Sequence, residues 1–186
     1  MRRFARLKPG RSRTARRGGA LSLCVLLAAG DAAGAAREQA SLVAAIKATY
    51  LYKVAPFVTW PAPPQGSFTI CTTGDDDVTA LAPQVVANQQ VNGVPISLRN
   101  IADSKSADGC QILYIADNAP DPAGALAGKP ILTVAGRPDA NGEIVRFVVV
   151  GDHVRFDIDN RQAEDSGLKI SSKLLSLAHR TTGGAP

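Results

Sequence analysis

Few side chains in this sequence have the types and spacing that covalent chemistry requires. The only histidines are His153 and His179, and neither is followed by a metal-ligand partner at helical or turn spacing. No nucleophile elbow, phosphate-binding loop or zinc-protease motif occurs. We therefore expect a protein that is not an enzyme and that carries no cofactor and no metal.

The cysteines are the other reactive side chains. Cys71 and Cys110 form an even pair after the N-terminal segment that contains Cys24. An oxidising compartment favours a disulfide between the two, which closes a loop of about 40 residues and stabilises the fold by roughly 4 kcal/mol. The alternative is a pair of buried free thiols. A two-cysteine metal site is disfavoured because neither residue has a Cys or His near it.

Two segments carry side chains suited to binding. The segment Tyr50–Trp60 holds four aromatic residues in eleven, and aromatic rings anchor interfaces and ligand pockets, although they equally fill cores. Ser171, Ser172 and Lys173 stand at an expected helix start, where backbone N–H groups can receive an anion. A helix cap beside an exposed lysine is the simpler alternative. Trp60 and these three residues are our candidate ligand or partner contacts.

The N-terminal residues have the pattern of a secretory signal peptide. Residues 1–19 hold eight basic residues and no acid, Ala20–Ala29 is a short apolar run, and Ala33-Gly34-Ala35 is a small-residue cleavage site. The alternative is a basic arm that binds nucleic acid. Removal of residues 1–35 would change the net charge from +5 to about −2, so the electrostatic basis for nucleic-acid binding would disappear. The apolar run is too short to span a membrane.

The remaining chain reads as one α/β domain. It is long enough for one core, and 45% of the whole sequence is apolar. Apolar spacing predicts a first helix that Pro56 ends, and Asp75–Asp77 precede a second helix as caps, with a divalent-cation site as the less favoured alternative. Strand and helix signals then alternate, which favours a mixed β-sheet sandwiched by helices, followed by a C-terminal β-hairpin and helices. The expected helices cover residues 38–55, 78–90, 121–127, 160–166 and 170–177, and the expected strands cover residues 68–72, 94–98, 111–116, 131–134, 143–150 and 153–158.

Several of these segments also carry a family resemblance. The segments are Ala48–Lys53 with Phe57–Pro61, Phe68–Cys71, Cys110–Ile115, Ile131–Val134, Val154–Asp159 and Gly167–Leu175. In order and spacing they resemble the YfiR-like periplasmic family from about Ser41 to Ala178. Pro56 departs from the family pattern, in which a polar residue is commoner.

The resemblance implies a small, exported, dimeric α/β protein without catalysis. Such a protein would bind the periplasmic part of an inner-membrane diguanylate cyclase or sensor kinase, lowering cyclic di-GMP output and biofilm formation. Redox control through disulfides would fall on Cys71 and Cys110. We expect a signal peptide at 1–35, a YfiR-like domain at 36–180 and a disordered tail at 181–186. The alternative is a periplasmic small-ligand module that feeds a sensor kinase, with Trp60 and Ser171–Lys173 in one pocket.

Overall fold

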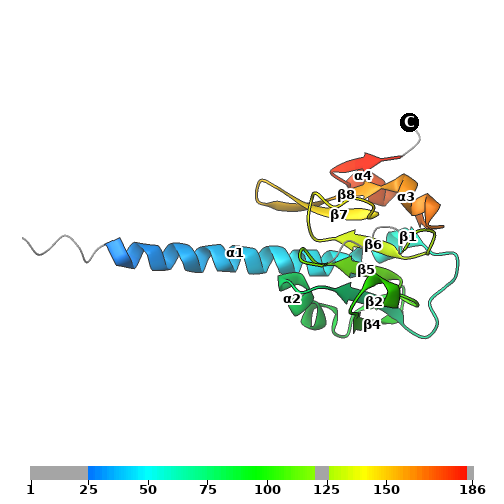
Figure 1. Cartoon of the computed structure of the whole chain (residues 1–186), viewed down its shortest axis with the longest axis horizontal. Helices are drawn as coiled ribbons and strands as arrows, with labels where there is room; N and C mark the ends of the chain where they lie inside the picture. The colour runs from blue at the N-terminus through cyan, green and yellow to red at the C-terminus, as the bar shows by residue number, and fades with distance from the viewer. Residues whose placement is uncertain (1–24, 120–125, 184–186) are drawn as a thin grey trace, which may run out of the picture. The chain divides into compact units, whose positions relative to one another are not determined.

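The computed structural model describes residues 25–119 and 126–183, with side chains described from residue 33 onward (Figure 1). Most of the expected signal peptide and most of the helix expected at 121–127 lie outside the described residues. Residues 37–186 form one compact unit, which contains every contact discussed below. No helix in the described part of the chain has both the length and the apolar character needed to cross a membrane.

The first helix, α1 (Val25–Lys53), buries one side along its C-terminal half. Ala44, Ala48 and Leu51 recur at helical spacing and are almost fully buried, so this narrow face lies against the core. The apolar stripe expected from the sequence flanks that face and packs half-buried against the core at Val43, Ile46 and Tyr50.

The end of α1 follows from Pro56, as the sequence predicts. The helix stops at Lys53, and Pro56 lies in a short 3-10 turn, η1 (Ala55–Phe57). Proline has no N–H to donate, and its ring clashes with the carbonyl one turn earlier, so a proline in this position ends or kinks an α-helix. The chain then enters the short strand β1 (Val58–Thr59).

Eight strands form one mixed sheet in the order β10-β8-β7-β6-β5-β2-β4-β3 (Figure 1). The strands are β2 (Phe68–Thr73), β3 (Gln90–Val91), β4 (Val94–Asn100), β5 (Ile112–Ile115), β6 (Leu132–Ala135), β7 (Val145–Val150), β8 (His153–Asp159) and β10 (Arg180–Thr182). Neighbouring strands from β4 to β7 pair in parallel, whereas β3–β4 and β7–β8 are antiparallel. All residues of β5 and β6 are buried, as in a sheet covered on both faces. The expected mixed α/β class is confirmed.

The helix that follows β2 is capped as its acidic start predicts. Asp76 is the N-cap of α2 (Asp77–Val86): its carboxylate accepts from the Thr79 backbone N–H at 2.8 Å, and Thr79 Oγ1 accepts from the Asp76 N–H at 2.9 Å. The helix ends at Val86 rather than Gln90, because Gln90 is already paired in β3. Asn92 and Gly93 both have positive φ and make the tight turn from β3 to β4.

The hairpin β7–β8 is confirmed, with its turn at Gly151 and Asp152. The ring of Tyr50 in α1 stacks on Phe147 at 6.2 Å between centroids and meets Phe156 edge-on at 5.8 Å. These aromatic contacts attach the first helix to the C-terminal part of the sheet.

The C-terminal segment alternates short helices and short strands. These elements are α3 (Asn160–Asp165), β9 (Lys169–Ile170) and α4 (Ser172–Leu177). A second 3-10 turn, η2 (Ser104–Ser106), lies earlier in the chain, between β4 and β5. Ile170 pairs with Val58 of β1 instead of starting the last helix, because Ser171 is the residue that caps α4. Thr181 and Thr182, the first residues of the expected tail, pair with β8 as part of β10.

Candidate functional site

Cys71 and Cys110 form the expected disulfide. Cys71 lies inside β2, and Cys110 precedes the adjacent strand β5, so their Cα atoms are 5.8 Å apart, a separation typical of a disulfide. Cys71 is completely buried and Cys110 is 4% exposed. The bridge therefore ties the connection after β4 to the centre of the sheet.

Arg99 organises the same connection from β4. It is paired with Cys71 in register, and side chains at the same register point to the same face of a sheet. Its Nη2 donates to the carbonyl oxygens of Asp108 at 2.7 Å and Ser106 at 3.3 Å, and to Cys110 Sγ at 3.1 Å. One guanidinium thus holds both the loop and the disulfide sulfur in place.

A cavity of about 500 Å³ opens beside this bridge, at the edge where the parallel strands begin. Residues just before or at the start of β2, β5 and β6 form its floor, and the segment after β1 forms a wall. It is lined by Trp60, Pro61, Ala62, Pro63, Gln65, Ser67, Thr69, Asp108, Gly109, Cys110, Gln111, Lys129, Pro130 and Ile131. Its volume is within the range of about 300–1,000 Å³ that is typical of small-molecule sites.

Hydrogen bonds hold the wall of the cavity against its floor. Trp60 Nε1 donates to the backbone oxygen of Gln111 at 3.2 Å, and the Thr69 N–H donates to Gln111 Oε1 at 2.7 Å. The indole also meets the Phe68 ring edge-on at 5.3 Å. The polar atom of Trp60 is therefore satisfied inside the protein, and the half-buried ring contributes apolar surface to the cavity.

An ion pair stands at the rim. Lys129 Nζ donates to Asp108 Oδ1 at 2.7 Å, and the Asp108 side chain is 81% exposed. The hydrogen bond and the positive charge of Lys129 lower the pKa of Asp108 below its ordinary value. This carboxylate is consequently charged at neutral pH.

The opposite edge of the sheet is closed. Counted from β2, the chain goes first to β4 on one side and then to β5 on the other, so the strand order reverses between β2 and β5. Doubly wound sheets bind ligands at the carboxyl ends of the strands at such a point. Here Tyr114 Oη donates to Asp76 Oδ2 at 2.7 Å, across that point. Burial, and then the hydrogen bond to Asp76, raise the pKa of Tyr114 far above its usual value.

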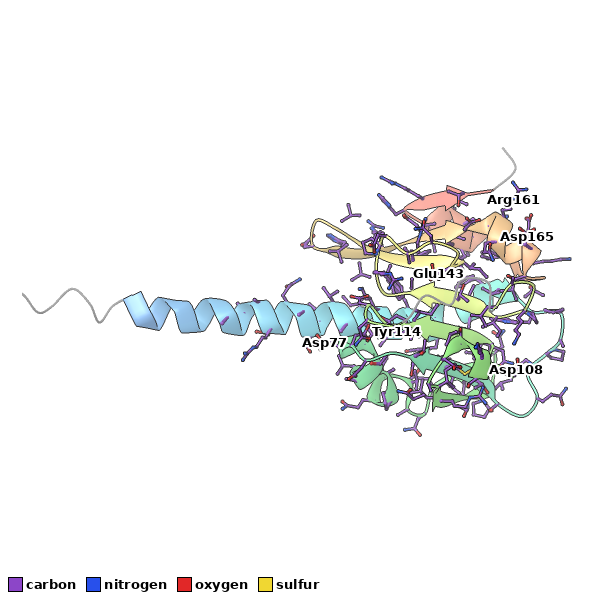
Figure 2. The ribbon with its side chains drawn as sticks, in the orientation of Figure 1. Asp77, Asp108, Tyr114, Glu143, Arg161 and Asp165 are labelled. Atoms are coloured by element: carbon purple, nitrogen blue, oxygen red, sulfur yellow. A yellow bond between two sulfur atoms is a disulfide. The ribbon has the colours of Figure 1, made fainter. Side chains whose placement is uncertain are left out.

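Glycines complete the closure. A Cβ on Gly74 would lie 2.7 Å from Ala119 Cβ, and one on Gly136 would meet Tyr114 Oη. Figure 2 shows Tyr114 and Asp77 toward one end of the strands and Asp108 toward the other.

Within the described ranges, no group of three or more acidic, histidine or cysteine side chains could hold a metal ion. Of the acidic residues after β2, Asp76 caps α2, and its carboxylate also accepts from Tyr114.

The other candidate residues from the sequence lie away from the cavity. The Ser171 hydroxyl caps α4 by accepting from the Leu174 N–H at 3.3 Å, and Lys173 Nζ lies 5.5 Å from the centre of the Phe57 ring. Ser172 is the first residue of α4 and is exposed. β1 and β9 pair antiparallel, so the chain continues from β1 to Trp60 at one end of this two-stranded ladder and from β9 to Ser171 at the other end. Trp60 lines the cavity, and Ser171–Lys173 do not.

The histidines are also separate from the cavity. His153 is exposed at the hairpin turn beside Asp152, and His179 Nδ1 lies 3.0 Å from Asp157 Oδ1 near the C-terminus. Sequence analysis did not identify Arg99, Lys129 or Gln111 as site residues. No local pattern marks Arg99 or Lys129, since strand register and loop packing bring them to the site.

In the comparison with protein-family models, the family described as YfiR/HmsC-like matches residues 44–179, which is more than half of the chain and includes the disulfide and the cavity. A search of curated proteins found no match.

Proposed function

We propose that this chain, which belongs to the YfiR/HmsC-like family, is a periplasmic negative regulator of an inner-membrane signalling protein. The family is periplasmic and fits regulation of diguanylate cyclase signalling rather than catalysis. The observation that carries the proposal is the family match over nearly the whole folded unit. The buried disulfide supports it, because such bridges persist in oxidising compartments.

In this proposal residues 1–35 are a signal peptide, and the regulatory domain runs from residue 36 through β10 (Arg180–Thr182). Export would leave a mature domain with a net charge of about −2. The mature domain would act from the periplasmic side, as a homodimer, on the sensor part of a diguanylate cyclase or a sensor kinase. Nucleic acid is not a partner, and the cleaved domain does not insert into the membrane.

The regulator would act by holding its partner in a low-output state. Its binding would lower cyclic di-GMP and with it biofilm formation. A partner bound only by the oxidised domain would be released on reduction, because loss of the Cys71–Cys110 bridge frees the loop that Arg99 organises. The regulatory element in this mechanism is the connection from β4 to β5.

Cyclic di-GMP measured in cells tests the proposal. Deletion of the gene should raise cyclic di-GMP, and the full chain should restore the lower level. A version that starts at residue 36 and stays in the cytoplasm should not restore it. The Cys71→Ala/Cys110→Ala variant, compared at equal periplasmic abundance, should restrain the partner less than Lys105→Met, a change at an exposed residue of the same loop. Unchanged cyclic di-GMP after deletion would refute the cyclase form of the proposal.

A further inference from the structure

The cavity beside the disulfide has no role in the function proposed above. We propose that it binds a small, flat molecule that carries one carboxylate group. The proposal stands on three observations: the volume of the cavity, the apolar character of most of its lining, and the single cation among the lining residues. It does not depend on the identity of the signalling partner.

The walls favour a flat apolar group. The indole of Trp60 and the rings of Pro61, Pro63 and Pro130 provide rigid hydrocarbon surfaces, and the buried Ile131 also lines the cavity. Trp60 already donates its N–H to Gln111, so an aromatic ligand can stack on the indole without leaving a buried donor unpaired. Rigid walls lose little conformational entropy when a ligand binds.

The rim favours a carboxylate. Lys129 is the only cation and Asp108 the only acid among the lining residues. The Asp108 side chain is 81% exposed, so it is readily hydrated if it turns away, whereas the Lys129 side chain is only 37% exposed. A ligand carboxylate inside the cavity can therefore replace Asp108 as the acceptor of Lys129. A neutral ligand cannot make this charge-assisted hydrogen bond.

The two edges of the sheet support the same assignment. Tyr114 and the glycine contacts fill the carboxyl edge, where a sheet with this strand order usually binds ligands. The amino edge instead has a cavity, whose lining includes the polar residues Thr69, Gln111 and Lys129. Cys110 also lines it, so a bound ligand would contact the segment that the disulfide restrains.

Trp60 is the only tryptophan in the chain, so its fluorescence reports on the cavity directly. We would titrate the mature domain with benzoate and, as a neutral match of the same shape, benzamide. N-Acetyltryptophanamide corrects for absorption by the probes, and chloride at equal ionic strength corrects for salt. We expect a saturable change with benzoate at about tenfold lower concentration than with benzamide, since a hydrogen bond to a charged group is worth about 1.5 kcal/mol or more.

Three variants make the test specific. Lys129→Met keeps the hydrocarbon stem and should weaken benzoate binding to the level of benzamide. Asp108→Asn removes the competing carboxylate and should strengthen benzoate binding. Loss of structure would instead weaken it. Lys105→Met removes an exposed lysine outside the cavity and should leave both titrations unchanged.

The absence of a saturable change with either probe would overturn the proposal. Equal binding of benzoate and benzamide, or benzoate binding that survives Lys129→Met, would overturn the assignment of a carboxylate. Melting temperatures of all three variants should match the wild type, because the changed side chains lie at the surface or rim. The outcome is independent of cyclic di-GMP, so failure here leaves the proposed regulator untouched.

Discussion

Asp76 accepts hydrogen bonds from three separate segments of the chain. Its carboxylate receives the Thr79 N–H at 2.8 Å, the Tyr114 hydroxyl at 2.7 Å and the Asp117 N–H at 3.4 Å. A residue that the sequence marks only as a helix cap thus also joins the ends of β2 and β5. The sequence predicts the cap because three consecutive Asp residues precede an expected helix, whereas Tyr114 is 38 residues away.

Tyr114→Phe should lower the free energy of unfolding by about 1.5 kcal/mol, because a hydrogen bond to a charged acceptor is lost inside the fold. Urea unfolding followed by circular dichroism measures the change. Tyr50→Phe is the matched control, since the structure shows ring stacking for Tyr50 and no hydrogen bond from its hydroxyl within the described residues. Equal effects of the two substitutions would contradict the role given to the Tyr114 hydroxyl.

The loops at the carboxyl edge pack as tightly as the elements that they connect. Gly74 has a φ of +80°, and a Cβ there would lie 2.7 Å from Ala119 Cβ and 2.9 Å from Ala116 Cβ. Gly93, in the turn between β3 and β4, has a similar φ of +84° and open space around it. Both glycines therefore have a left-handed backbone, and only Gly74 has close neighbours where a Cβ would lie.

Gly74→Ala should destabilise the domain clearly more than Gly93→Ala. Both substitutions carry the backbone cost of about 1–2 kcal/mol for a left-handed residue, and only Gly74→Ala adds a clash with two buried neighbours. Thermal unfolding of the two variants side by side measures the difference. Equal melting temperatures would mean that the carboxyl edge is loose enough to accept a ligand after all.

The elements themselves were largely predictable from the sequence. Pro56 marks the end of α1, Asp76 the start of α2, and Gly151-Asp152 the hairpin, because each acts through its immediate neighbours. The cavity was not predictable. It requires three loops to meet at one edge, and that meeting depends on strand order and register, which local patterns do not encode. The same reason separated Trp60 from Ser171–Lys173, which the sequence had placed in one pocket.

At the scale of the whole molecule, the disulfide joins β2, in the interior of the sheet, to the connection between β4 and β5. Replacing both cysteines, as Cys71→Ala/Cys110→Ala, should lower the free energy of unfolding by about 3–4 kcal/mol, the loop-closure value for a separation of 39 residues. Urea unfolding with and without reductant measures it. Reductant should bring the wild type to the stability of the variant and leave the variant unchanged. A loss below about 1 kcal/mol would contradict a stabilising role for the bridge.

One folded unit thus has a closed carboxyl edge and an open amino edge, with a buried bridge near the open one. The YfiR/HmsC-like family to which the chain belongs is regulatory rather than enzymatic. The regulator proposal predicts that partner binding depends on the fold as a whole, and on the state of the bridge in particular.

Capture of a partner from membranes tests that claim most directly. The oxidised mature domain would be immobilised, exposed to detergent-solubilised inner membranes and analysed by mass spectrometry, beside Cys71→Ala/Cys110→Ala and a heat-unfolded sample. We predict enrichment of one membrane protein with a periplasmic sensor segment and a cytoplasmic cyclase or kinase, strongest with the oxidised domain. Enrichment of no such protein over the unfolded sample would contradict the proposed regulator.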